Sequence, residues 1–196
     1  MKLESLVAHK SGTRPGSKTI CRLILASFCI LLITGCASPA TPRGMQARSV
    51  VIRNKYPFTV SVQGIGGRET NPALTSEISG DSFAQAVCDS IVESGVFRTV
   101  VPSGNGDYLL EVSIMNVDKP TVGLDMTATM AVNWELTHVA TDKVIFQKVI
   151  NSTYTATVGD ALVAIKRLRL AQEGAARENI EEGLKRISQL NLNGKE

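Results

Sequence analysis

The sequence predicts an α+β domain: a mostly antiparallel four-stranded sheet with two helices on one face, in the element order β-α-β-β-β-α. Four segments within residues 56–156 alternate apolar and polar side chains, which is the period of a half-buried strand. Two further segments, 83–92 and 161–190, repeat apolar residues at helical spacing. Since each apolar helix face needs an apolar sheet face to cover, we expect helices and sheet to share one core.

The first strand is predicted at residues 56–63, whose apolar members are Tyr56, Phe58, Val60 and Val62. Pro57 cannot donate to a sheet ladder, so it belongs at the start of this strand or on an edge. The glycine-rich run 64–67 follows. A phosphate-cradling loop is one interpretation of it, but the spacing fits neither glycine-rich fingerprint. A turn or bulge is the favoured interpretation.

The first helix covers residues 83–92, with Ser79 or Asp81 as its N-cap and Gly95 as its left-handed C-terminal residue. Its first residues, Gly80-Asp81-Ser82-Phe83, resemble the nucleophile block of GDS-type hydrolases. That family needs a buried strand before the block and a downstream Asp-x-x-His. Here a polar loop precedes it, and the nearest candidate ends at His138 inside a predicted strand. Capping is therefore favoured, and a periplasmic serine hydrolase using Ser82 and His138 is the alternative.

Residues 96–101 are predicted as a short strand or an extended link. Three longer strands follow at 108–115, 126–137 and 144–156, joined by turn-rich segments. The middle one has the cleanest alternation and places Trp134 in the core. Its polar face is the candidate partner-docking face and consists of Thr127, Thr129, Asn133, Glu135 and Thr137. Simple solvation is the alternative, because antiparallel sheets commonly leave one face in water.

The last helix is predicted from about residue 159 onward. The small residues Gly174 and Gly183 allow it to lie close to the sheet or to bend. Lys166, Arg167 and Arg169 form a basic cluster early in it, for which contact with anionic lipid is one interpretation. Several acid–base pairs at i,i+4 spacing favour a self-neutralising solvated face instead.

The charge balance and the few Cys and His residues argue against nucleic-acid binding, an internal disulfide and a metal site. Beyond the five basic residues and one acidic residue of 1–35, 16 Lys and Arg face 17 Asp and Glu, a net charge of −1. A near-neutral domain gives no electrostatic case for nucleic acid. Of the four cysteines, Cys21 and Cys29 lie in the segment 1–35, which is predicted below to be removed, and Cys36 is the predicted lipid attachment site. Cys88 is then the remaining thiol, which forms no internal disulfide, and it is predicted to be a buried small residue. His138 alone builds no metal site, and we expect no cofactor.

Residues 1–35 are predicted to be an export signal. A positively charged head precedes the apolar run 23–35, whose 13 residues are fewer than the roughly 20 that span a bilayer. The run ends in Ile33-Thr34-Gly35-Cys36, which resembles the lipobox of bacterial lipoproteins. The resemblance implies diacylglyceryl transfer to the Cys36 thiol, cleavage between Gly35 and Cys36, and acylation of the new amino group. Ala37 after the cysteine implies sorting to the outer membrane.

Residues 36–55 are predicted to form the lipidated N-terminus and a tether, and residues 56–196 the periplasmic α+β domain. The element order of 56–190 resembles that of small outer-membrane accessory lipoproteins of the LptE and YajG types and of auxiliary lipoproteins of lipid-transport systems. No functional motif of these families is matched residue by residue. The resemblance implies a non-catalytic accessory or assembly factor, anchored by lipid and facing the periplasm, that binds an envelope protein or lipid-handling partner.

Overall fold

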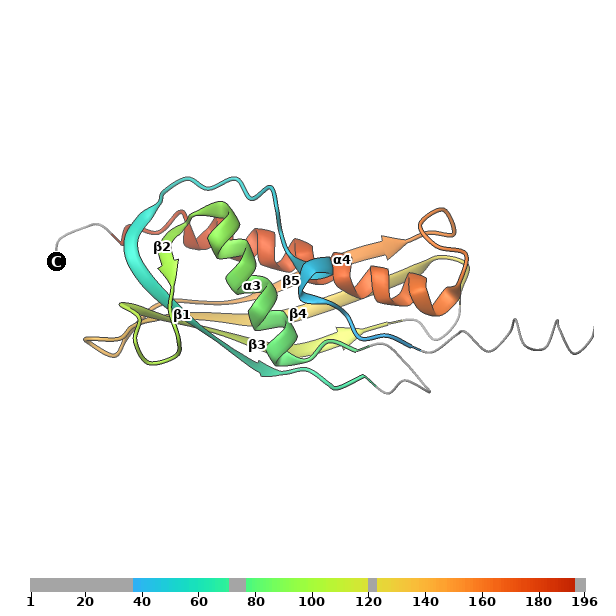
Figure 1. The fold of residues 1–196 in the computed structure, drawn as a ribbon, viewed down its shortest axis with the longest axis horizontal. Helices are drawn as coiled ribbons and strands as arrows, with labels where there is room; N and C mark the ends of the chain where they lie inside the picture. Colours follow the sequence, from blue (N-terminus) through green and yellow to red (C-terminus); the bar gives the residue numbers. More distant parts are fainter. Residues whose placement is uncertain (1–36, 71–76, 120–122, 193–196) are drawn as a thin grey trace, which may run out of the picture. The chain divides into compact units, whose positions relative to one another are not determined.

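A computed structural model describes residues 37–70, 77–119 and 123–192 (Figure 1). Every described residue belongs to one compact unit, 36–196. The predicted export signal and Cys36 lie outside the described residues. Within the described part, no helix is long and apolar enough to cross a bilayer. The elements are α2 (Pro42–Met45), β1 (Tyr56–Gly66), α3 (Gly80–Ser94), β2 (Phe97–Val100), β3 (Tyr108–Asp118), β4 (Met126–His138), β5 (Lys143–Ala156) and α4 (Ala164–Ile187).

The five strands form one mixed sheet in the order β2-β1-β3-β4-β5. β1 lies between β2 and β3 and is parallel to both, whereas β3, β4 and β5 are antiparallel neighbours. The antiparallel pairings are the longer ones, so the predicted mostly antiparallel α+β sheet is confirmed in this coarse form. The predicted number of four strands was wrong, because residues 97–100 pair with β1 and become a fifth, edge strand.

The helices form one layer over the sheet. Phe83 of α3 packs edge-on against Trp134 at a ring distance of 6.5 Å, and Gly183 of α4 lies against the same indole. Both long helices therefore cover the same face (Figure 1). The predicted caps of α3 are confirmed, since the Ser79 hydroxyl accepts from the Ser82 amide and Gly95 has φ 64°. The predicted count of two helices was wrong: the single turn α2 is a third.

The long helix approaches the sheet closely where its side chains are smallest. A Cβ built on Gly183 would lie 2.6 Å from the Trp134 ring, and one on Gly174 would lie 2.2 Å from the Tyr154 ring. This confirms the close approach expected from the small residues. Asn179 sits between these glycines and is fully buried. Its carboxamide accepts from Trp134 Nε1 at 2.9 Å and donates to the Ile150 carbonyl at 2.9 Å.

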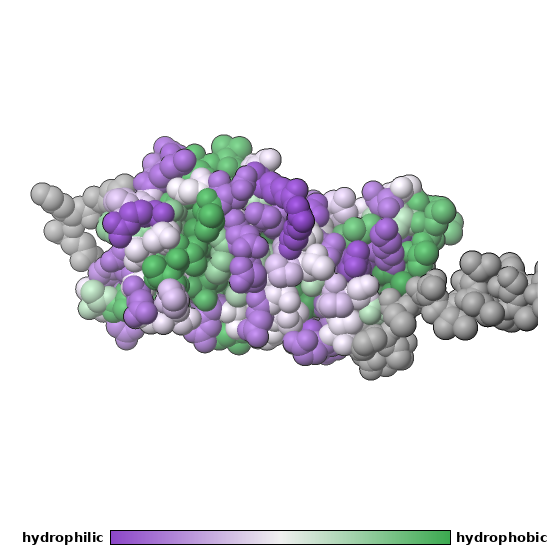
Figure 2. All heavy atoms as spheres, viewed as in Figure 1, coloured by the Kyte–Doolittle hydropathy of each residue, from purple (hydrophilic) through white to green (hydrophobic). Residues whose placement is uncertain are grey.

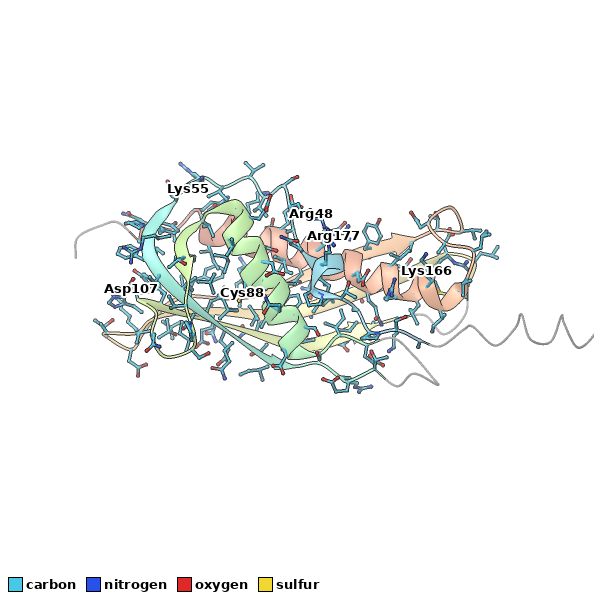
Figure 3. All side chains as sticks on the ribbon, in the orientation of Figure 1. Arg48, Lys55, Cys88, Asp107, Lys166 and Arg177 are labelled. Carbon is cyan, nitrogen blue, oxygen red and sulfur yellow. The ribbon has the colours of Figure 1, made fainter. Side chains whose placement is uncertain are left out.

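The segment 37–55 is packed on the domain, where the sequence predicts a tether. Met45 has no exposed surface and contributes to the core. The Glu173 carboxylate accepts from the amide and hydroxyl of Thr41 at 2.9 and 3.0 Å. Arg177 Nη2 donates to the Gly44 carbonyl at 2.7 Å, and Figure 3 shows its side chain beside α2. Pro and Gly in this segment therefore form a capped turn held by α4, not a free linker.

The helical layer presents a mixed surface to solvent. In Figure 2, hydrophilic and hydrophobic residues are interspersed over most of this side of the molecule. Hydrophobic residues also gather at the end where α4 begins, over the loop that joins β5 to α4 (Figures 1 and 2).

Candidate functional site

The face of the sheet opposite the helices is open in the described part of the chain. Every second side chain of β4 points away from the helices and is only partly covered. This places the predicted docking residues together in one row on the middle antiparallel strand: Thr127, Thr129, Asn133, Glu135 and Thr137. The row is therefore accessible to a partner.

Neighbouring strands extend this row into a polar surface. The Thr127 and Thr155 hydroxyls are 2.8 Å apart, and the Gln147 amide donates to the Glu135 carboxylate at 2.8 Å. On the other side, Glu111 of β3 stands directly opposite Glu135 in the register. The Ser113 hydroxyl donates to the Glu111 carboxylate at 3.3 Å. The centre of the open face thus carries two carboxylates side by side, held by hydrogen bonds from neighbouring polar groups.

Glu111 was missed as a site residue by sequence reasoning. Its position on the polar side of the strand 108–115 was visible, but the pairing with Glu135 depends on the register between two strands. Like charges directly opposite each other in an antiparallel pair are destabilising. A partner that brings positive charge or hydrogen-bond donors would be complementary to this position of the sheet.

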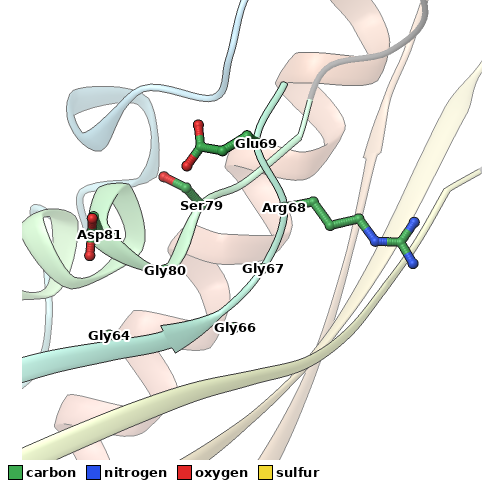
Figure 4. A pocket seen from close by; sticks show the side chains of 8 residues that line it. All are labelled: Gly64, Gly66, Gly67, Arg68, Glu69, Ser79, Gly80 and Asp81. Carbon is green, nitrogen blue, oxygen red and sulfur yellow. The ribbon is translucent and has the colours of Figure 1, made fainter. Parts of the chain in front are cut away.

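The glycine-rich end of β1 forms a small pocket with the start of α3 (Figure 4). Its volume is about 180 Å³, and it is lined by Gly64, Gly66, Gly67, Arg68, Glu69, Ser79, Gly80 and Asp81. A Cβ on Gly64 would lie 2.2 Å from the Gly80 carbonyl oxygen, so this glycine lets the helix lie on the strand. Gly66 and Gly67 have φ of 77° and 76°, which side chains with a Cβ rarely adopt.

The pocket is poorly suited to an anionic ligand such as phosphate. Figure 4 shows the Glu69 side chain close to Ser79, whereas the Arg68 side chain points away from the pocket. Two carboxylates, from Glu69 and Asp81, are part of the lining, so a phosphate there would meet negative charge. These glycines permit close packing of α3 on β1. The favoured interpretation as a turn or bulge was wrong for residues 64–66, which continue β1 in unbroken parallel register with β3.

Ser82 and His138, the alternative catalytic pair, are not brought together. Ser82 lies in the first turn of α3, and its hydroxyl is 3.0 Å from that of Ser79. The first residue of this turn, Gly80, packs against Gly64 and Gly66 of β1. The Nδ1 atom of His138 is 2.8 Å from the Thr141 hydroxyl. The register places Gly64 opposite Val112 but His138 opposite Tyr108, a separation of about 13 Å along the strand at roughly 3.3 Å per residue. No proton can pass directly between these two side chains.

The remaining candidate residues have structural environments. Cys88 is half-buried on α3 (Figure 3), and burial raises the pKa of its thiol, which keeps it protonated. Arg167 of the predicted basic cluster is buried and donates to the carbonyls of Ala161 and Leu162 at 2.8 Å. Arg169 lies 3.7 Å from Glu173, as the i,i+4 spacing predicts. Among the described residues, no group of three or more His, Cys, Asp or Glu side chains is placed to hold a metal ion.

Comparison with known proteins finds solved structures with a similar fold but no family model or curated protein with a similar sequence. No protein-family model matches the chain, and no curated protein matches it. Protein XCC0632 of Xanthomonas campestris, from the family DUF330, gives a TM-score of 0.52 at 13% identity and covers 72% of this chain and 90% of its own. Protein CT253 of Chlamydia trachomatis gives 0.52 at 9% identity, with 70% and 99% covered.

A candidate lipoprotein of Caulobacter crescentus reaches a TM-score of only 0.47, at 15% identity, with 66% of this chain and 87% of that chain covered. At TM-scores of 0.52, the first two structures share the main features of this fold. Identities this low carry no information on partners or chemistry. The chain therefore has an α+β fold that also occurs in solved bacterial proteins.

Proposed function

We propose that this protein is a lipid-anchored envelope lipoprotein that acts as a non-catalytic accessory factor and binds an envelope protein through the open sheet face. The observation that carries the docking proposal is the Glu111–Glu135 pair at the centre of that face. Like charges directly opposite each other are unfavourable in an antiparallel pair, and a complementary partner that covers them offsets this repulsion. The partner that fits is a protein segment presenting Lys, Arg or backbone N–H groups to a row of hydroxyl, amide and carboxylate acceptors.

The anchor is supported by the sequence, in which the lipobox-like motif ends at Cys36 after a short apolar run. Several acyl chains make a durable anchor, at about 0.8 kcal/mol per buried methylene, whereas one chain gives only marginal binding. Cys36→Ser is expected to leave an unprocessed precursor and to abolish metabolic labelling with palmitate. Persistent labelling of this variant would show that another cysteine is acylated, and Cys29→Ser would then be the next variant.

The docking face is tested by site-specific photo-crosslinking in cells. A crosslinker at Thr129 is expected to give a discrete adduct, whereas one at Glu93, an exposed position on α3, is expected to give none. Glu111→Lys should remove the Thr129 adduct, because it reverses one charge of the pair while leaving the anchor intact. Mass spectrometry of the adduct should locate a basic segment in the partner. Equal adducts at both positions, or an adduct unaffected by Glu111→Lys, would leave this face as a solvated surface.

We propose no catalytic role. The separation of Ser82 from His138 removes the pair on which the hydrolase alternative depends. A hydrolase assay with general ester substrates would overturn this part of the proposal if activity were present and were lost in Ser82→Ala.

A further inference from the structure

Large apolar side chains are exposed at one end of the domain. Leu124 is 79% exposed in the connection between β3 and β4, and Leu162 is 86% exposed in the connection between β5 and α4. Val158 and Val163 are also exposed in the second connection. The first residue of β4, Met126, pairs with the last residue of β5, Ala156, so both connections leave the sheet at the same end. Figure 2 shows the hydrophobic residues gathered there.

The loop that carries Leu162 is held in place from two sides. The Asp160 carboxylate accepts from the amide and the hydroxyl of Thr157 at 2.7 and 2.9 Å, which closes the turn after β5. The buried Arg167 guanidinium donates to the carbonyls of Ala161 and Leu162. A buried charge on α4 therefore fixes the backbone around Leu162, and its side chain is presented outward by a defined loop.

The described chain begins at this same end. Ala37 is buried against the domain, and the amide of Ala40 donates to the Glu77 carbonyl at 3.2 Å. The Glu77 carboxylate in turn pairs with Lys119, the residue directly after β3. Figure 1 shows the segment before α2 running toward the end where the two connections lie. In the sequence, Cys36 directly precedes Ala37, so lipid on Cys36 would be attached beside the domain without an intervening spacer.

From these positions we infer that the end bearing Leu124, Leu162 and Val163 lies against the lipid bilayer. The inference rests on the proposed lipid anchor and adds the orientation of the domain to it. Lys166 at the start of α4 lies at this end (Figure 3), but Asp125 and Asp160 lie in the same two connections. Since the charges are mixed, insertion of apolar side chains is the source of the contact, and anionic headgroups are not required.

The test uses the mature lipidated protein, purified from membranes and reconstituted into phosphatidylcholine vesicles with brominated acyl chains. Leu162→Trp places a fluorescent reporter at the inferred contact, and the native Trp134 is fully buried in the domain. Bromine is expected to quench the added emission about twofold, because interfacial side chains lie roughly 5–10 Å into the headgroup–acyl boundary. Val149→Trp, on the open face of β5, is the matched control and is expected to stay unquenched.

A second reporter position, combined with added charges, separates insertion of this end into the bilayer from its proximity to the membrane surface. Leu124→Trp should be quenched like Leu162→Trp, and adding Leu162→Glu should remove that quenching while the protein stays in the vesicle fraction. Adding Val149→Glu should leave it unchanged. Replacing part of the phosphatidylcholine with the anionic lipid phosphatidylglycerol should change the quenching little. Quenching that occurred only when phosphatidylglycerol was present would overturn insertion by apolar side chains.

The other outcomes each have a distinct meaning. Equal, weak quenching at positions 162 and 149 in protein that remains with the vesicles would overturn the inferred contact and leave the anchor standing. A blue-shifted emission from the Leu162→Trp variant without bromine quenching would mean that a second copy or another protein covers this end, which also overturns it. Absence of the protein from the vesicle fraction would overturn the lipid anchor, and with it the orientation built on that anchor.

Discussion

Glu173 and Thr41 connect the start of the described chain to the long C-terminal helix. One carboxylate oxygen of Glu173 accepts from both the amide and the hydroxyl of Thr41, at 2.9 and 3.0 Å, although the residues are 132 positions apart. Glu173 is buried in the middle of α4. The segment that the sequence predicts to be a tether is thereby fixed on the domain, which is what places residue 37 at a defined end.

Glu173→Ala is expected to release this segment. The substitution removes the shared acceptor of both Thr41 hydrogen bonds, at a cost of about 1–3 kcal/mol. Glu173→Gln is the matched control, because its amide oxygen can still accept both hydrogen bonds, and we expect a smaller loss. Denaturant unfolding measures the stability, and hydrogen exchange at the Thr41 and Gly44 amides measures the local release. Equal losses in both variants would mean that charge, not the shared acceptor, holds the segment.

Gly183→Ala is expected to destabilise the protein by forcing α4 away from Trp134. An added Cβ would lie 2.6 Å from the indole ring, and overpacking of this kind costs about 1–3 kcal/mol. Alanine gains about 1 kcal/mol in helix propensity over glycine, which offsets only part of that cost. Thermal unfolding followed by Trp134 fluorescence checks the result. Gly159→Ala, whose added Cβ would lie 3.4 Å from the nearest atom, should change stability by less than about 0.5 kcal/mol.

Asn179→Ala should destabilise the interface between α4 and the sheet. Its carboxamide satisfies Trp134 Nε1, the Ile150 carbonyl and the Ser152 hydroxyl, all at 2.9–3.1 Å. Removing it leaves at least one buried group unpaired, at a cost of about 1–3 kcal/mol. Ser152→Ala removes only one of these contacts and should cost less. A Trp134 emission spectrum unchanged by Asn179→Ala, with unchanged stability, would contradict this role.

Asp107 is expected to make stability depend on pH in the acid range. Hydrogen bonds from the Thr59 amide and hydroxyl lower the pKa of this carboxyl. A lowered folded-state pKa means that the stabilisation is fully present above the ordinary value of about 3.9 and is lost as pH falls through the lowered value. Asp107→Asn should therefore be less stable than the natural protein at pH 7, and the difference should shrink below about pH 4.

The control for Asp107 is Asp125→Asn at an exposed position in another connection. Its unfolding midpoint is expected to follow that of the natural protein across the same pH series. A difference in stability between Asp107→Asn and the natural protein that stayed constant as pH fell would contradict this prediction. It would mean that the contribution of the hydrogen bonds from Thr59 does not depend on ionisation of the Asp107 carboxyl.

The predicted strands and helices differed in how strongly the sequence signalled them. β4 alternates over its whole length and was predicted nearly to its ends, whereas the four residues of β2 are too short to show a period. The parallel placement of β1 between β2 and β3 could not be predicted, because alternation reports which face is buried and not which strand is the neighbour. The same limit applied to Glu111 and Glu135, whose pairing depends on register.

By itself, the sequence predicted the coarse fold class, the buried sides of β3 and β4, the Gly95 cap of α3 and the lipobox-like motif, because each of these depends on local pattern. Only the tertiary structure decided that residues 37–47 pack on α4, that Ser82 and His138 are apart, and that Leu124 and Leu162 share one end. These relationships join residues far apart in the chain. They follow from strand order, register and the buried contacts of Glu173 and Arg167, which no local period encodes.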